Sequence, residues 1–240
     1  GRNKTGTSSL QRSLADARPA LAERGIAYPA PGANHHYLAN HLHRRKRRRL
    51  AGEQVEKADA SVERLNRGLA ATTADTAVLS SEAFQTVPPR FLAEWIGAGA
   101  TVRIVIYIRE QLDWLSSFYQ QAVKARLVTA SLADFAARYD PDYLRILAPW
   151  ERVFGRDNVV VRVYDRETLV DGDVVADFVS VLGVGREVVP TVPGDANPSI
   201  GGALLEAKRR LNGLGLDEEA LRLATLGPLR HLAEETPAFR

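Results

Sequence analysis

The chain has 240 residues, enough for one full-sized α/β domain or two small ones, each able to bury a core. Hydrophobic residues make up 45% and charged residues 25%, as in ordinary globular proteins, and no apolar run reaches the ~18 residues that a membrane span needs. The absence of cysteine excludes disulfides and thiolate metal sites, and nothing indicates an oxidising compartment, so we expect a cytoplasmic protein.

The sequence predicts alternating helices and strands. In chain order we expect a helix over 10–25, an extended segment at 26–28, one or two exposed helices over 37–71, a short buried strand at 77–79, a strand at 101–108, a helix over 113–126, a strand at 158–164, a helix over 174–182, a loop over 185–199 and a final helix over 200–211. Strands separated by helices favour right-handed crossovers, so we expect a three-layer α/β/α fold with a mainly parallel central sheet.

The sequence also contains no methionine, so we expect it to begin inside a longer open reading frame. We expect a single domain over 1–240 that is truncated at the N-terminus and also at the C-terminus. The oligomeric state is left open.

The net charge of +3 is unevenly distributed, because residues 43–49 read HRRKRRR. This run has three interpretations: a solvated helix face, a patch for an anionic acceptor such as a glycan or lipid headgroup, or a nucleic-acid contact. No aromatic residue interleaves with it, which weakens the third interpretation, and we expect no nucleic-acid partner.

The first loop has the glycine spacing of a nucleotide-binding P-loop, with Gly1 and Gly6 separated by four residues. Thr7 stands where that motif has its lysine, and a lysine lies within the loop instead, at Lys4. Backbone amides and the following helix start would still cradle an anion, and Lys4 could stabilise charge on a leaving phosphate. Further donors are the hydroxyls of Thr5, Thr7, Ser8 and Ser9. The alternative is a flexible Ser/Thr/Gly-rich terminus.

A second anion anchor follows the strand at 101–108. Arg109 ends that strand, and Ser117 comes eight residues later, one turn into the next helix. A guanidinium fork and a hydroxyl at the carboxyl edge of a sheet suit a phosphate. The alternative is an arginine that caps a strand and a serine that faces solvent.

Together these motifs resemble the sulfotransferase family. KTGTSSLQ is followed about 100 residues later by a strand ending in R-x-x-x-x-x-x-x-S-x-Y, and the stretches at 77–84, 161–169 and 197–212 are similar to the bacterial branch. The resemblance implies a P-loop NTPase-like fold and sulfuryl transfer from 3′-phosphoadenosine 5′-phosphosulfate to a hydroxyl or amine. It implies that Arg109 and Ser117 hold the 3′-phosphate, and that the 5′-phosphosulfate is held by Lys4, Thr5, Gly6, Thr7, Ser8 and Ser9. In the family a hydrophobic strand precedes this loop, so we expect one before Gly1.

The transfer needs a general base, for which members of the family use histidine or glutamate. His35 and His36 lie in a loop, and Glu82 follows the short strand at 77–79, at the sheet edge where ligands gather in α/β folds. The two histidines could instead be solvated, and Glu82 could instead be a helix cap or an ion-pair partner. We expect no metal, because the histidines lack carboxylate or cysteine partners at ligand spacing. The acceptor is left open among small molecules, glycans and lipids.

Three alternatives to a sulfotransferase stay open. A P-loop kinase or NTPase is disfavoured by Thr7 at the lysine position and by the lack of a strand ending in a convincing magnesium-binding aspartate. A non-enzymatic module could act through the basic run at 43–49. The truncated chain could also be inert.

Overall fold

The computed structural model describes residues 5–43, 52–126, 128–139, 142–192, 201–214 and 231. The chain forms two compact units, one made of Gly1–Arg109 and Asp142–Pro193, the other of Glu110–Pro141 and Gly194–Arg240. The expectation of a single domain stays a prediction.

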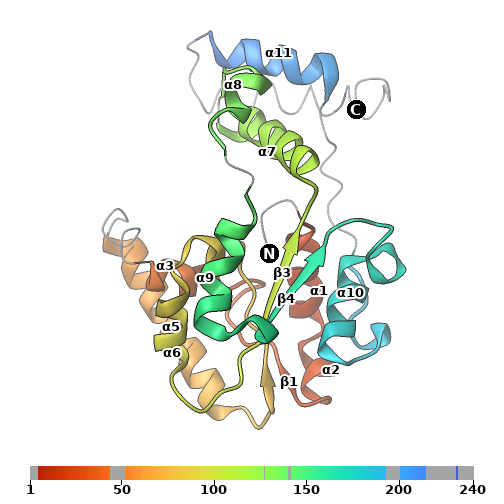
Figure 1. The fold of residues 1–240 in the computed structure, drawn as a ribbon. Helices are drawn as coiled ribbons and strands as arrows, with labels where there is room; N and C mark the ends of the chain where they lie inside the picture. Colours follow the sequence, from red (N-terminus) through yellow and green to blue (C-terminus); the bar gives the residue numbers. More distant parts are fainter. Residues whose placement is uncertain are drawn as a thin grey trace. The chain divides into compact units, whose positions relative to one another are not determined.

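The first unit alternates helices with short strands (Figure 1). Its α-helices are α1 (Thr7–Asp16), α2 (Arg18–Ala22), α3 (His36–Leu42), α5 (Gly52–Ala71), α6 (Pro89–Ile96), α9 (Leu144–Phe154) and α10 (Val174–Leu182). Its strands are β1 (Ile26–Ala27), β2 (Thr76–Ala77), β3 (Ile104–Ile108) and β4 (Val159–Val163). Short 3-10 helices are η1 (Glu82–Thr86), η2 (Arg156–Asn158), η3 (Val170–Gly172) and η4 (Arg186–Val188).

The four strands pair in parallel, as the sequence predicts. β1 pairs with β2, with Ile26 opposite Thr76, and β3 pairs with β4 from Ile104 opposite Val159 to Ile108 opposite Val163. In the described residues the strands form two separate two-stranded sheets instead of one continuous sheet. The α/β class and the parallel pairing are therefore confirmed, whereas a single continuous sheet stays a prediction.

Two expectations about local structure differ from the fold. The predicted helix over 10–25 is divided, because α1 ends at Asp16 and α2 begins at Arg18 with Pro19 in its first turn. Proline has no N–H and suits a first turn, so a new helix starts there. The short strand is β2 at Thr76–Ala77, where both residues are exposed, and the buried Val78 follows it.

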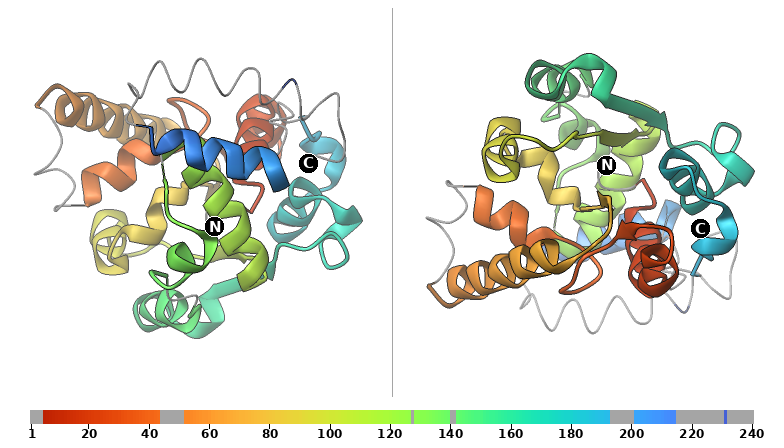
Figure 2. Two further views of the ribbon diagram at one scale, coloured as in Figure 1. Left: turned by 90° about the horizontal axis from the view of Figure 1, so that it is seen from above. Right: turned by 90° about the horizontal axis from the view of Figure 1, so that it is seen from below.

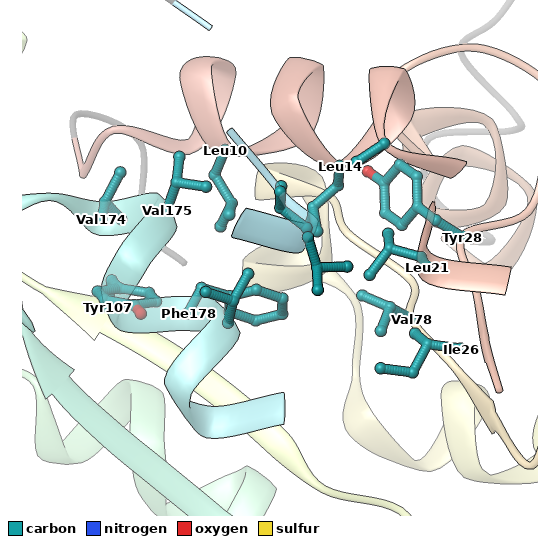
Figure 3. Close-up of a cluster of buried hydrophobic side chains, with 14 of the residues drawn as sticks. Leu10, Leu14, Leu21, Ile26, Tyr28, Val78, Tyr107, Val174, Val175 and Phe178 are labelled. Atoms are coloured by element: carbon teal, nitrogen blue, oxygen red, sulfur yellow. The ribbon is translucent and has the colours of Figure 1, made fainter. Parts of the chain in front are cut away.

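The largest core cluster of the unit lies between α1 and α10. Figure 3 shows Leu10 and Leu14 of α1 projecting toward Val175 and Phe178 of α10, and Leu14 and Val175 are fully buried. Ile26, Val78 and Tyr107 belong to the same cluster, so both strand pairs contribute to one core. Burial of this apolar surface fixes α1, and with it the loop at its start.

A second core cluster packs against the opposite face of β3. Ile106 belongs to it whereas Tyr107 belongs to the first, because successive strand residues face opposite sides. Most of its other buried members come from α3, α5, α6 and α9 and include Leu38, Leu65, Leu92 and Trp150. Figure 2 shows α5 alongside α3 from above and from below. β3 is therefore covered by helices on both faces, as the α/β/α expectation requires locally.

The second unit is helical in its described residues and consists of α7 (Gln111–Arg126), α8 (Leu132–Ala136) and α11 (Gly202–Asn212). An aromatic cluster joins α7 to α8, with Trp114 stacked on Phe118 at 5.2 Å between ring centroids and Phe118 against Phe135 at 5.6 Å. Asn212 at the end of α11 donates to the carbonyl of Val123 at 2.9 Å, which ties α11 to α7.

Nowhere along the described ranges is a helix both long enough and apolar enough to cross a bilayer.

Candidate functional site

The loop before α1 turns through Gly6, which adopts the left-handed conformation with φ of 69°. A Cβ at this position would lie 2.8 Å from Tyr164 Cε2 and 3.0 Å from Val174 Cγ1, so both the backbone and the packing require glycine. The first helical hydrogen bond runs from Leu10 N to Gly6 O at 3.2 Å. The amides of the three preceding residues therefore come before the helical ladder, and amides in this position at a helix start can bind an anion.

The hydroxyl groups of this loop point in different directions. Thr5 and Thr7 are buried, with exposed fractions of 0% and 4%, whereas Ser8 is exposed. Ser9 Oγ donates to the carbonyl of Val192 at 3.2 Å, toward the chain segment that follows η4. Lys4, the predicted cation of the loop, lies outside the described residues.

Thr7 joins the loop to the predicted base. Its Oγ1 donates a hydrogen bond to Oε1 of Glu82, the first residue of η1, across 75 positions of sequence. Ser81 holds the start of η1 because its Oγ accepts from Ala83 N at 3.1 Å. The carboxylate of Glu82 therefore lies directly against the start of α1.

His35 is fully buried, and both of its ring nitrogens are engaged with the backbone. Nδ1 accepts from Ser80 N at 3.0 Å, so Nε2 carries the proton and donates to the carbonyl of Pro29 at 3.1 Å. Burial, assisted by the nearby charge of Arg18, lowers the pKa of His35 despite these hydrogen bonds. A neutral imidazole with both nitrogens occupied fastens the 29–35 loop to the segment that follows β2.

His36 occupies the first position of α3 and is half-buried. Its Nδ1 lies 3.2 Å from Ser81 Oγ, and its backbone N donates to Asn34 Oδ1 at 3.1 Å. The two histidines thus contact neighbouring residues of one segment, 80–82.

That segment follows β2 and is the meeting point of the site. From α1, Gln11 Nε2 donates to Ser80 Oγ at 3.1 Å, one turn beyond the contact between Thr7 and Glu82. The structure therefore brings together Thr7, His35, His36 and Glu82, four of the residues predicted for the site. Gln11, Ser80 and Ser81 were not predicted as site residues, although the S-S-E sequence directly after a strand was a usable signal.

The two residues predicted for a 3′-phosphate lie in different units. Arg109 follows β3 in the first unit and is partly buried, and its carbonyl accepts from the Tyr143 hydroxyl. Ser117 is partly buried in α7 of the second unit. Because α7 begins at Gln111, Ser117 lies in its second turn. The pairing of Arg109 with Ser117 stays a prediction.

Other predicted features can be located only in part. The basic run at 43–49 lies outside the described residues except for His43, which follows α3. Within the described ranges, no group of three histidine, aspartate or glutamate side chains is arranged to hold a metal ion.

Comparison with known proteins adds one relative. A protein of Archaeoglobus fulgidus, described as "Uncharacterized protein", is 36% identical over 110 residues, which cover 46% of this chain and 30% of that protein. The match thus spans less than a third of the relative's length. No protein-family profile matches the chain, and no solved structure matches it.

Proposed function

We propose that the chain is the core of a sulfotransferase, which moves a sulfuryl group from 3′-phosphoadenosine 5′-phosphosulfate to a hydroxyl or amine. The contact between Thr7 and Glu82 carries the proposal, because it joins the start of an anion-binding helix to a carboxylate. Sulfuryl transfer needs these two elements side by side, one to hold the leaving phosphate and one to take the acceptor's proton.

In the proposed reaction the acceptor oxygen or nitrogen attacks the sulfur in line with the bond to the 5′-phosphate. That S–O bond breaks, its electron pair leaves with the phosphate, and the acceptor's proton goes to the base. The amides at the start of α1 hold the phosphate, and Gly6 makes the left-handed turn that leads into them. Lys4 stabilises the charge on the bridging oxygen as it leaves. No step requires a metal.

We propose Glu82 as the base, with His36 as the alternative. A carboxylate can accept a proton, and Glu82 is half-buried and lies within hydrogen-bond reach of the start of α1 through Thr7. His35 suits a positioning role better, because both of its ring nitrogens are already bonded to the backbone.

The P-loop-like sheet belongs to the same proposal. Both strand pairs contribute to one core cluster, through Ile26 and Val78 on one side and Tyr107 on the other. A further strand between the two pairs would join them into one parallel sheet and satisfy both inner edges.

A titration tests the donor site. Adenosine 3′,5′-bisphosphate, the product of the donor, should bind the chain more tightly than ATP with Mg²⁺. Arg109→Ala should raise the Kd of the bisphosphate by about tenfold or more, since a charge-assisted contact is lost. The matched control is Arg103→Ala, an exposed arginine before β3, which should leave affinity unchanged. Tighter binding of ATP would contradict the proposal and favour a kinase or NTPase.

Turnover is a separate measurement. With donor labelled at the sulfur, the label should move to at least one member of a panel of phenols, amines, glycans and lipids, and the bisphosphate should be released. Binding of the bisphosphate without transfer to any acceptor would support the site but not the activity of this chain.

A further inference from the structure

The hydroxyl of Thr7 has a single hydrogen, and it stands beside the helix start that the proposed function assigns to a phosphate. In the structure it donates to Oε1 of Glu82. Thr7 is also the first residue of α1, next to the amides that the proposed function assigns to the 5′-phosphate. With only 4% of Thr7 exposed, bulk water has little access to this hydroxyl. A hydroxyl has one O–H, so it cannot donate fully to both acceptors at once.

We propose that Thr7 is a ligand-operated switch, whose hydroxyl donates to Glu82, as in the structure, until a donor binds and then donates to the phosphate of that donor. The inference rests on the proposed function and adds a form of regulation to it. A hydroxyl exchanges its acceptor by rotation about its C–O bond.

The surrounding contacts favour this local change. Ser81 holds the start of η1 through Ala83 N, and Gln11 holds Ser80 from α1 at 3.1 Å. His35 fixes the same segment through its bond from Ser80 N. Because the carboxylate's backbone is held from two sides, Glu82 stays in place when Thr7 turns away from it.

The switch would make Glu82 a stronger base when the donor is bound. A carboxylate that loses a hydrogen-bond donor and gains an anionic neighbour holds a proton more tightly. Glu82 would therefore accept the acceptor's proton better once Thr7 donates to the bound phosphate than while Thr7 donates to Glu82.

A double-mutant cycle on bisphosphate affinity tests the switch. In the unmodified chain Thr7→Val should change the Kd by less than about threefold, because binding only exchanges one hydrogen bond for another. In a Glu82→Ala background no bond between these two side chains has to be broken, so Thr7→Val should weaken binding by about tenfold. Thr7→Ser keeps the hydroxyl and should behave like the unmodified chain in both backgrounds. Ser9→Ala is the matched control, because its hydroxyl donates to Val192 and should have the same effect with or without Glu82.

A second measurement needs no change at Thr7. Glu82→Ala should lower the Kd of the bisphosphate by about tenfold, because Glu82 no longer competes for the Thr7 hydroxyl or repels the 5′-phosphate. The Kd of adenosine 3′-phosphate should change by less than about twofold, since that ligand has no 5′-phosphate. The switch would be overturned if Thr7→Val changed the Kd equally in both backgrounds, or if Glu82→Ala lowered the Kd of both ligands equally. Neither result would contradict the proposed donor site. Failure of the unmodified chain to bind the bisphosphate would overturn both.

Discussion

Arg162 of β4 and Asp177 of α10 form an ion pair in which the aspartate is fully buried, with Arg162 Nε 3.0 Å from Asp177 Oδ2. The Tyr107 hydroxyl of β3 donates to the same oxygen at 2.6 Å. Burial acts to raise the pKa of Asp177, but the hydrogen bonds from Arg162 and Tyr107 outweigh it and hold the pKa below its usual value. This network locks α10 onto the β3–β4 pair.

Asp177→Asn should therefore destabilise the first unit strongly. The substitution leaves the Arg162 guanidinium, whose side chain is one-third exposed, beside a neutral amide, and the loss of its charge-assisted hydrogen bonds costs about 1.5–3 kcal/mol. The free energy of unfolding in urea measures the effect. The control is Asp171→Asn, which removes the exposed pair with Arg186 (3.4 Å) and should cost less than about 1 kcal/mol. Similar losses for the two variants would contradict the assignment.

Gly6→Ala should damage both stability and the donor site. Alanine is strained at the φ of 69°, and its Cβ would collide with Tyr164. Gly183 is a matched control, because it has φ of 75° and ψ of 23° but no atom within 4 Å of the place that a Cβ would take. Gly183→Ala should cost about 1 kcal/mol in the urea experiment, from the backbone strain alone, and Gly6→Ala about 2 kcal/mol more. Bisphosphate affinity should fall for Gly6→Ala only.

His35 should make stability fall in mild acid. Its pKa in the folded chain is lowered, so the unfolded chain binds a proton first as the pH drops through about 6.5. The stabilisation is complete above that value and is lost progressively toward the lower folded pKa, by at most about 1.4 kcal/mol per pH unit. Urea midpoints measured from about pH 7.5 down to about pH 5 should show this slope. The slope should diminish in His35→Gln, and an unchanged slope would assign the effect to another group.

Substitutions of Glu82 and His36 should affect turnover differently, because only one of the two residues is the base. Glu82→Gln should lower turnover by about 10²–10⁴-fold while the bisphosphate binds at least as tightly, since the base is lost but the phosphate site is kept. His36→Gln should lower turnover by less than about tenfold, because its ring contacts Ser81 and would not take the proton. The reverse pattern would assign the base to His36.

Local sequence patterns were sufficient for much of the fold. The helix at 174–182 has the predicted bounds, and β3 and β4 lie within the predicted strands, because β-branched runs and amphipathic spacing are local signals. α6 and α9 were not predicted. Proline suggests a break in a helix, yet Pro89 occupies the first turn of α6, and α9 continues through Pro149.

The sequence by itself determined which residue types stand at the start of α1 and after β2. Because the carboxyl ends of parallel strands meet at one edge of a sheet, it also predicted that these two segments lie close together. Only the tertiary structure decided that Thr7 donates to Glu82 and that His35 is buried between Pro29 and Ser80. Such contacts join residues as far as 75 positions apart and depend on how α1, α3 and η1 pack, which no local periodicity encodes. The sequence therefore identified the loop before α1, whereas the packing supplied its contact with Glu82.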